Sequence, residues 1–249
     1  VREFAAGDGD DHVVLVTSDG VRIEGPRSKL NLHPVISPYV KTSSEILSVG
    51  EVSGVHTQSG GVTVNWPDPP PHDQVARVAR YIMHISDWGV VATAATHSSI
   101  AGAPLANIYS VSDGPIGLPS GTPYFYASPW DISAKDWEAD PRVSFAMSEA
   151  QSDYCKKHDY DPESPVCARL ILNGNIVKLE NGTLENKFAH DSLFSRHPEM
   201  KEWPQGHHFY FAKLNITHIF LLDFYGGATE IPSIDYYKAQ PFDQNKNVK

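Results

Sequence analysis

The stretch VARVARYIMHISDWGVVATAAT, residues 75–96, decides the fold because it begins like a helix and ends like a buried strand. In its first half, apolar residues recur along one helical face, namely Val75, Val78, Ala79, Ile82 and Ile85. Asp73 precedes this pattern and is expected to cap the helix. After Trp88 the side chains become small or β-branched, which favours a strand.

The rest of the chain continues the strand pattern. Short β-branched or aromatic runs are separated by Gly, Pro or Asp turns: ANIYSVSD, PYFYAS, RVSFAMS, CARLILNGNIVKL, FYFAKL and THIFLLDF. In RVSFAMS, Val143, Phe145 and Met147 share one face of the strand, and Asn173-Gly174 signals a hairpin or a bulge. Two helical stretches, around 131–139 and 184–196, interrupt the strands. The sequence therefore predicts a mainly β protein with helices, an antiparallel barrel with helical caps.

Residues 1–71 read differently from residues 72–249. Residues 12–25 alternate around Asp19-Gly20 and predict a hairpin, whereas residues 26–65 are rich in Ser, Gly and Val without a helical period. The run WPDPPP then ends the segment, since Pro continues neither a helix nor a central strand. We interpret 1–71 as an N-terminal extension with a few short strands, and 72–249 as the main domain.

Composition limits the partners of the chain. Its 249 residues carry a formal net charge of −10, so clustered Lys and Arg for a polyanion are not expected. Nucleic acid and anionic membranes are thereby disfavoured, and no apolar run reaches the ~20 residues of a membrane span. The N-terminus has no signal-peptide core, but a cleaved signal peptide is compatible with a mature secreted chain.

Two features point to the secretory pathway. Asn181-Gly-Thr and Asn215-Ile-Thr are N-glycosylation sequons. Cys155 and Cys167 are the only cysteines, and the polar loop between them favours one disulfide over a pair of free thiols.

Candidate chemistry in the sequence is sparse. His84 could act as a base oriented by Asp87, but the structural alternative is favoured, in which Ser86 and Asp87 close the helix and Trp88 plugs the bottom of the barrel. His207-His208 is interpreted as a surface pair rather than a metal site, because neighbours in a strand point to opposite faces. The segment CKKHDYDPE (155–163) is expected to be a solvated loop. No nucleophile or metal motif is present, so no catalytic or metal residue is predicted.

Six segments, in order, resemble the CREG (cellular repressor) family over about residues 73–240. They are ARYIMHISDWGVVAT, SVSDGP, GTPYFYASP, YCKKHDYDPESPVCARL, LFSRHPEMKEWP and FAKLNITHIFLLDFYGG. The resemblance implies the FMN-binding split barrel of the pyridoxamine-phosphate-oxidase superfamily, a six-stranded Greek-key barrel. It also implies a secreted or endolysosomal homodimeric glycoprotein without enzymatic activity, which acts in growth control and differentiation and binds the mannose-6-phosphate/insulin-like growth factor II receptor. Asn215 matches a glycosylation position of that family.

The flavin groove implied by this resemblance lacks charge in the sequence. From Tyr81 to Ala134 there is no Lys or Arg, and the strands there offer only hydroxyls, on Thr93, Ser110 and Ser112. A phosphate dianion needs charge-assisted donors or a helix N-terminus, which only more distant cations could supply: Arg142, Lys156, Lys157 or Arg196. Residues 114–123 are expected to cover the groove. We therefore expect a vestigial site without cofactor, with a flavin- or haem-binding oxidoreductase as the alternative.

Overall fold

The structure is a computed structural model that describes residue 64, residues 66–243 and the backbone of five short strands before them. The chain divides into two compact units, one of residues 1–53 with Lys249 and one of residues 54–248. Each unit is described by itself.

The first unit holds a three-stranded antiparallel sheet in the order β1-β2-β3. Its strands are β1 Arg2–Ala5, β2 His12–Val16 and β3 Arg22–Pro26. Strands β2 and β3 pair with Leu15 opposite Ile23, which agrees with the predicted hairpin. Asp19 and Gly20, the expected turn, lie outside the described residues. The second unit starts with the paired strands β4 His56–Gln58 and β5 Gly61–Thr63.

Helix α2, Val75–Ile85, is the helix predicted by the opening stretch, and it buries Val78, Ala79, Ile82 and Ile85. The prediction of its cap is wrong. Gln74, not Asp73, is the N-cap residue, and no side chain donates or accepts a capping bond there. At the other end Ser86 closes the helix, with its hydroxyl donating to the Ile82 carbonyl at 2.7 Å.

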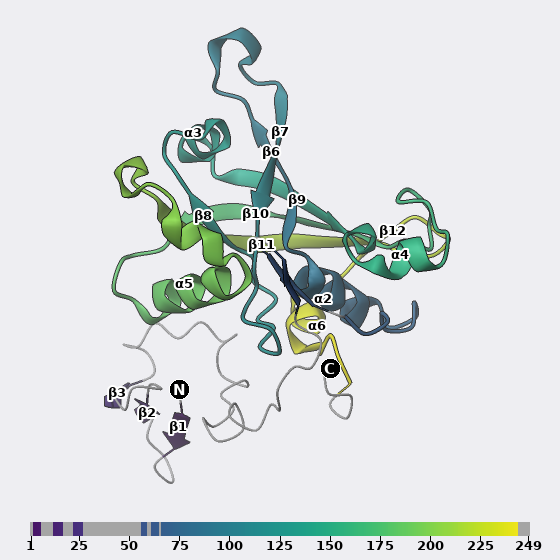
Figure 1. The fold of residues 1–249 in the computed structure, drawn as a ribbon, viewed down its shortest axis with the longest axis horizontal. Coiled ribbons are helices and arrows are strands. Elements are labelled where there is room, and N and C mark those ends of the chain that lie inside the picture. The colour runs from purple at the N-terminus through teal and green to yellow at the C-terminus, as the bar shows by residue number, and fades with distance from the viewer. Residues whose placement is uncertain are drawn as a thin grey trace. The chain divides into compact units, whose positions relative to one another are not determined.

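Seven antiparallel strands form the main sheet (Figure 1). They are β6 Trp88–Ala94, β7 Pro104–Ser110, β8 Tyr124–Ala127, β9 Arg142–Ser148, β10 Arg169–Lys178, β11 Tyr210–Leu222 and β12 Ala228–Glu230. The two strands predicted at 209–214 and 217–224 are one strand, β11. Its pairing with β10 shifts by one residue at Asn173/Gly174, so the Asn-Gly signal marks a bulge and not a hairpin.

The sheet curls into a barrel. Its hydrogen-bonded order is β11-β10-β9-β6-β7, and β8 pairs with the free edge of β11. An isolated bridge between Ser112 and Tyr124 joins the chain just after β7 to β8, which closes the ring. Six strands therefore encircle the core and β12 extends one edge, which confirms the predicted antiparallel, mainly β barrel with helices.

Helices cover the barrel. α2 packs beside α6, Ser233–Lys238, while α5, Leu184–Arg196, lies against β8 and β11 (Figure 1). The stretches predicted as helical are α3, Ile132–Ala139, and α5. The remaining helical turns are α4 Asp153–Lys157, η2 Ser98–Ile100, η3 Glu149–Gln151, η4 Pro198–Glu202 and η5 Gln205–His207. Each strand turns alternate residues to the core. Val143, Phe145 and Met147 are buried, as predicted, whereas Ser144 and Ala146 lie on the outer face.

The two cysteines form a disulfide, Cys155–Cys167, with 5.6 Å between their Cα atoms. Both cysteines are buried. The bond closes the loop that begins in α4 and holds it against the start of β10. Between the cysteines Lys156, Lys157 and His158 are exposed, as expected for a solvated segment.

Candidate functional site

The polar corner between α2 and β6 is a buried ion pair, and its acid is Asp113. The His84 Nδ1 lies 2.6 Å from the Asp113 carboxylate, and both side chains are fully buried. The pairing of His84 with Asp87, which the sequence analysis disfavoured, is therefore not formed. Burial alone would raise the pKa of Asp113, but His84, Arg80 and the Gly121 amide hold it below its ordinary value.

Asp87 instead binds Arg196, at 2.5 Å from the guanidinium Nη2. Arg196 reaches this corner from the end of α5, donates to the His84 carbonyl at 2.9 Å, and lies over the Trp66 ring. Trp88 does not plug the barrel, because it is 44% exposed on the outer face. The corner thus ties α2 to α5. Of the structural alternative, helix closure by Ser86 is found, whereas Asp87 binds Arg196 and the Trp88 plug is wrong.

Arg80 fixes the segment expected to cover the groove. Its Nη2 donates to the Pro119 carbonyl at 2.8 Å, and the Gly121 amide donates to Asp113 at 2.9 Å. Gly121 has φ +80°, and a Cβ there would meet the Arg80 guanidinium at 2.8 Å. The Tyr236 hydroxyl of α6 donates to the Gly121 carbonyl at 2.9 Å. Residues 114–121 are therefore clamped onto the barrel between α2 and α6.

The structure does not bring the three predicted groove hydroxyls together. Thr93 pairs with Leu105 and faces the interior, while Ser110 pairs with Trp88 near the other end of the hairpin and on the opposite face. The Thr93 hydroxyl donates to Asp136 at 2.7 Å, and the buried Ser112 hydroxyl donates to the Gly114 carbonyl at 3.0 Å. Each of these two hydroxyls serves the protein itself.

The outer face of the barrel carries an apolar row across five strands. Its residues are direct partners in the sheet register: Phe220, Ile171, Ala146, Val90 and Ile108, on β11, β10, β9, β6 and β7. Ile108 is 65% exposed and the other four are half-buried. Within the described part of the chain, no member of this row belongs to the hydrophobic core. We call these five residues the apolar row.

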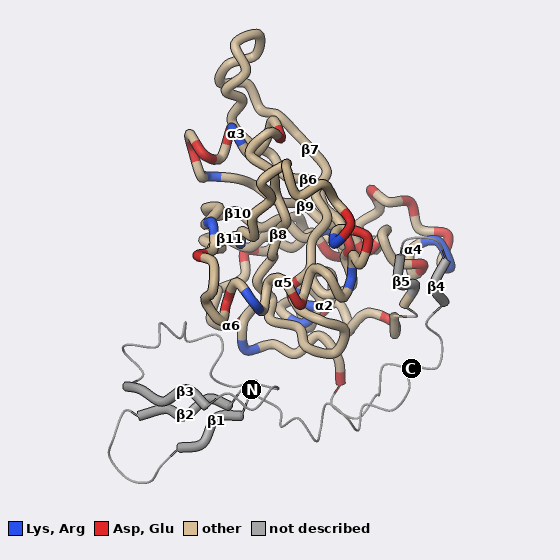
Figure 2. Tube along the Cα trace, turned by 60° about the vertical axis from the view of Figure 1, so that its left-hand side comes forward, with Lys and Arg blue, Asp and Glu red and all other residues tan. Residues whose placement is uncertain are grey.

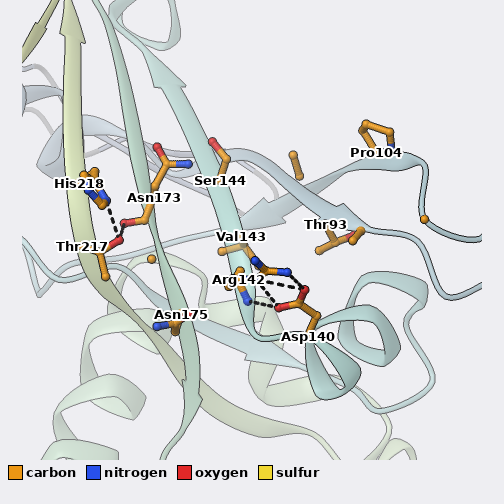
Figure 3. Close-up of a pocket in the computed structure, with 14 residues that line it drawn as sticks. Thr93, Pro104, Asp140, Arg142, Val143, Ser144, Asn173, Asn175, Thr217 and His218 are labelled. Carbon is orange, nitrogen blue, oxygen red and sulfur yellow. Dashed lines mark hydrogen bonds and ion pairs between the residues drawn. The ribbon is translucent and has the colours of Figure 1, made fainter.

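Next to the apolar row, two residues further along the strands, lies a polar row. Its polar residues are His218, Asn173 and Ser144, and the small Ala92 continues the row on β6; these four are again direct register partners. They line an open groove of about 610 Å³ together with Asn175, Thr217, Asp140 and Arg142 (Figure 3). The Arg142 guanidinium binds Asp140 and lowers the pKa of that carboxyl to about 2. Within the described residues, the side chains of Asn173, Asn175 and Ser144 make no hydrogen bond.

Comparison with known proteins gives the family of this barrel. A family model described as "CREG, beta-barrel" matches residues 70–238. The chain belongs to the CREG family. Human protein CREG1 is 45% identical over 171 residues, 69% of this chain and 77% of that protein. Mouse protein CREG2 is 39% identical over 175 residues, 70% of this chain and 59% of that protein.

Solved structures share the fold of this CREG chain. A heme binding protein from Mycobacterium smegmatis superposes with a TM-score of 0.53 and 20% identity, over 70% of this chain and 63% of that one. The protein Atu2129 from Agrobacterium tumefaciens gives 0.51 and 21%, over 70% and 64%. At these identities the likeness concerns the fold alone, and it agrees with the predicted split barrel.

The other predicted positions of the CREG chain lie at the surface. Asn181 is exposed in the turn before α5, and Asn215 is exposed on β11. His207 and His208 are not in a strand. His207 is the last residue of η5 and His208 follows it, and both rings contact the Trp130 ring. Among the described residues, no group of three or more His, Cys, Asp and Glu could hold a metal ion. Within the same residues, no helix is long and apolar enough to cross a bilayer.

A titratable cluster that the sequence does not predict lies beside the disulfide. Glu149 is buried and accepts from the Ala168 amide at 3.1 Å, and burial with the nearby Asp223 raises its pKa to about 7. Asp223 binds His72 at 2.6 Å, and its own pKa is raised by burial. These residues come from three distant segments, and their local sequence is unremarkable, so no spacing could have revealed them.

Proposed function

We propose that this CREG chain is a non-enzymatic glycoprotein that acts by binding, as a homodimer, through the outer face of its barrel. We further propose that it is secreted or endolysosomal and acts in growth control and differentiation, with the mannose-6-phosphate/insulin-like growth factor II receptor as a partner. One contrast carries the proposal. The buried Arg80 and Arg196 already bind groups of the chain itself, whereas the apolar row on the outer face of the barrel is uncovered.

The residues at the predicted groove do not fit an FMN phosphate. A phosphate dianion removed from water needs charged donors, because neutral hydrogen bonds contribute only about 0.5–1.5 kcal/mol each. Arg80 and Arg196 are buried and bound to carbonyls and carboxylates of the chain. Lys156 and Lys157 are exposed in the disulfide loop, and Arg142 binds Asp140 in the outer groove. The hydroxyls of Thr93 and Ser112 are likewise engaged.

The apolar row fits a second copy of the chain. In a two-fold dimer the same patch meets itself, so a row of Ile, Val, Ala and Phe finds a complementary apolar row on its partner. Burying it stabilises the pair by removing apolar surface from water. The five residues of this row carry no charge, and Figure 2 shows Lys and Arg as short, separated stretches along the described chain.

Glycans supply the proposed contact with the receptor. Asn181 and Asn215 are both exposed, so an N-glycan at either site points into solvent. Release of the glycans by a peptide N-glycosidase should lower the intact mass of the protein from a secretory host. An unchanged mass would reject both glycosylation and the secretory assignment.

The flavin alternative is tested by absorbance and calorimetry. We expect no band near 450 nm or in the Soret region in protein purified from its native source. We also expect no heat from titrating the protein with FMN at micromolar concentration. A sub-micromolar affinity for FMN would overturn the non-enzymatic assignment in favour of an oxidoreductase.

The dimer is tested by Val90→Asp, which places a charge in the middle of the apolar row. Val177→Asp is the matched control, because Val177 is an exposed valine of β10 outside that row. Light scattering should give twice the chain mass for the native protein and the control, and the single chain mass for Val90→Asp. A native protein at the single chain mass would exclude the dimer.

A further inference from the structure

The Asn215 sequon lies at the rim of the outer groove. Asn215 is the direct register partner of Asn175, and Asn175 is the partner of Arg142. Side chains of directly paired residues point to the same face of a sheet, on the order of 5 Å apart. The Asn215 amide therefore projects beside two residues that line the groove.

The bulge opens this corner of the groove. Because β11 carries an extra residue there, the adjacent Thr217 and His218 are both exposed instead of alternating. The Thr217 hydroxyl donates to the Asn173 carbonyl at 3.2 Å and lies 3.0 Å from the His218 Nδ1. Gly174 must be glycine here, since a Cβ would lie 2.2 Å from the Asn215 carbonyl oxygen.

The groove has the chemistry of a sugar site. The small apolar residues Ala92 and Ala94 line it together with Asn173, Asn175 and Ser144 (Figure 3), whose amides and hydroxyl have no hydrogen-bond partner within the described residues. Amides and hydroxyls both donate and accept, as the hydroxyl and acetamido groups of N-acetylglucosamine require. The Arg142 guanidinium binds Asp140 through Nε and Nη2, and its Nη1 group adds a charged donor at the edge.

We propose that this groove seats the first N-acetylglucosamine residues of an N-glycan on Asn215 of the same chain. The proposal rests on the glycosylation assigned under the proposed function. Attachment beside the groove gives the sugars a high effective concentration, so a seat with only a few neutral hydrogen bonds is populated. The seated glycan would border the apolar row, which lies two residues further along the strands than the polar row, and would confine the dimer contact to the apolar row.

The test compares how fast the glycan is released from the folded protein. The full chain is produced in a secretory host and treated with a peptide N-glycosidase, and occupancy of Asn215 and Asn181 is followed by peptide mass. We expect release at Asn215 to quicken about tenfold in the double variant Asn173→Ala, Asn175→Ala, and release at Asn181 to stay unchanged. Val177→Ala, on the same strand and face but outside the groove, is the control and should change neither rate. All rates are divided by those of the denatured protein.

Nuclear Overhauser contacts give a second readout that needs no variant. The acetyl methyl of the first sugar on Asn215 should show contacts to the β-protons of Asn173, one strand away, in ¹³C-labelled protein. If Asn215 carries the glycan but the double variant releases it at the native rate and these contacts are missing, the seat is rejected and the proposed function stands. If Asn215 carries no glycan, both fall.

The source of the sugar is settled by a dilution series. A glycan seated in its own chain keeps its slow release when the protein is diluted, and in Val90→Asp. A glycan held by the partner copy loses its protection under both conditions, which would overturn the assignment to the same chain.

Discussion

The inner and outer faces of the barrel are built by the same strands, but they differ in what covers their apolar side chains. On β6, Val91 is fully buried in the core while its neighbour Val90 is half-exposed on the outer face. On β9, Phe145 and Ala146 differ in the same way. Both faces are therefore apolar at their centre, but helices α2 and α6 fill only the inner one. An apolar strand residue indicates that a face needs a partner, and it does not say whether the partner is the protein itself.

Polar groups follow the same division. Inside, His84 binds Asp113 and Arg80 binds the backbone, although the His84 Nε2 and the Arg80 Nε have no hydrogen-bond partner within the described residues. Outside, Asn173, Asn175 and Ser144 keep their hydrogen-bonding capacity unused within the described residues. Unused groups on an open groove are available to a ligand at little cost, whereas the His84–Asp113 and Arg80–Pro119 bonds would have to break before a ligand could use those atoms.

The largest expected effect comes from breaking the inner ion pair. Asp113→Ala leaves His84 and the Gly121 amide without their buried acceptor, so we expect a loss of about 3–5 kcal/mol in the free energy of unfolding. Asp140→Ala removes the carboxylate of the outer pair with Arg142, which is exposed to water, and should leave the denaturation midpoint unchanged. Urea unfolding of both variants measures the contrast. Equal losses would show that the outer pair is structural too.

The second effect is a pH dependence. The pKa of Glu149 rises from 4.5 to about 7 on folding, so the folded protein favours the protonated acid. Its contribution is fully present below pH 4.5, falls as the pH rises, and is lost above pH 7. We expect the native protein to be more stable at pH 5 than at pH 8, by about 2 kcal/mol from this group. Glu149→Gln should flatten the profile between these values. A wild-type melting temperature that rises from pH 5 to pH 8 would contradict this.

The fold was predictable from the sequence where periodicity is local. The apolar face of α2, the alternation of RVSFAMS and the Asn173-Gly174 signal all depend on neighbours within a few residues. Strand β11 was divided in two because its bulge exposes Thr217 and His218 side by side, which breaks the period of two. The capping prediction failed because the chain enters α2 one residue later than the acid that resembled a cap.

The candidate site was less predictable because its contacts are long-range. Asp113 lies 29 residues beyond His84, and only closure of the barrel brings it to α2. Thr93 and Ser110 looked like neighbours because both are small hydroxyl residues of adjacent strands. Their faces depend on the register of the β6–β7 hairpin, whose long connection at 95–103 hides that register from the sequence. Motif resemblance supplied the family, but it could not say which polar groups are already used.

The third prediction compares two adjacent valines of β6. Val91→Ala removes two buried methyl groups from the core and should cost about 1–2 kcal/mol of unfolding free energy in the monomer. Val90→Ala trims the apolar row, so we expect less than about 0.5 kcal/mol in the monomer and a weaker dimer. Thermal unfolding below the dimer dissociation constant, together with sedimentation of both variants, separates the two effects. A larger loss of monomer stability for Val90→Ala would mean that the outer face is filled by the chain itself.

The smallest contrast is between two serine hydroxyls. Ser112 is fully buried, donates to the Gly114 carbonyl at 3.0 Å and accepts from the Gly114 amide at 3.2 Å, so Ser112→Ala leaves both backbone groups unpaired. We expect a loss of about 1 kcal/mol in the free energy of unfolding. Ser144→Ala removes a hydroxyl that has no partner within the described residues and should be neutral in protein without glycan. In protein that carries the Asn215 glycan, the same Ser144→Ala change should quicken glycan release, because the hydroxyl then has a sugar to bind. A stability loss for Ser144→Ala without glycan would show that the outer polar row serves the fold, and the division between the two faces would fail at this point.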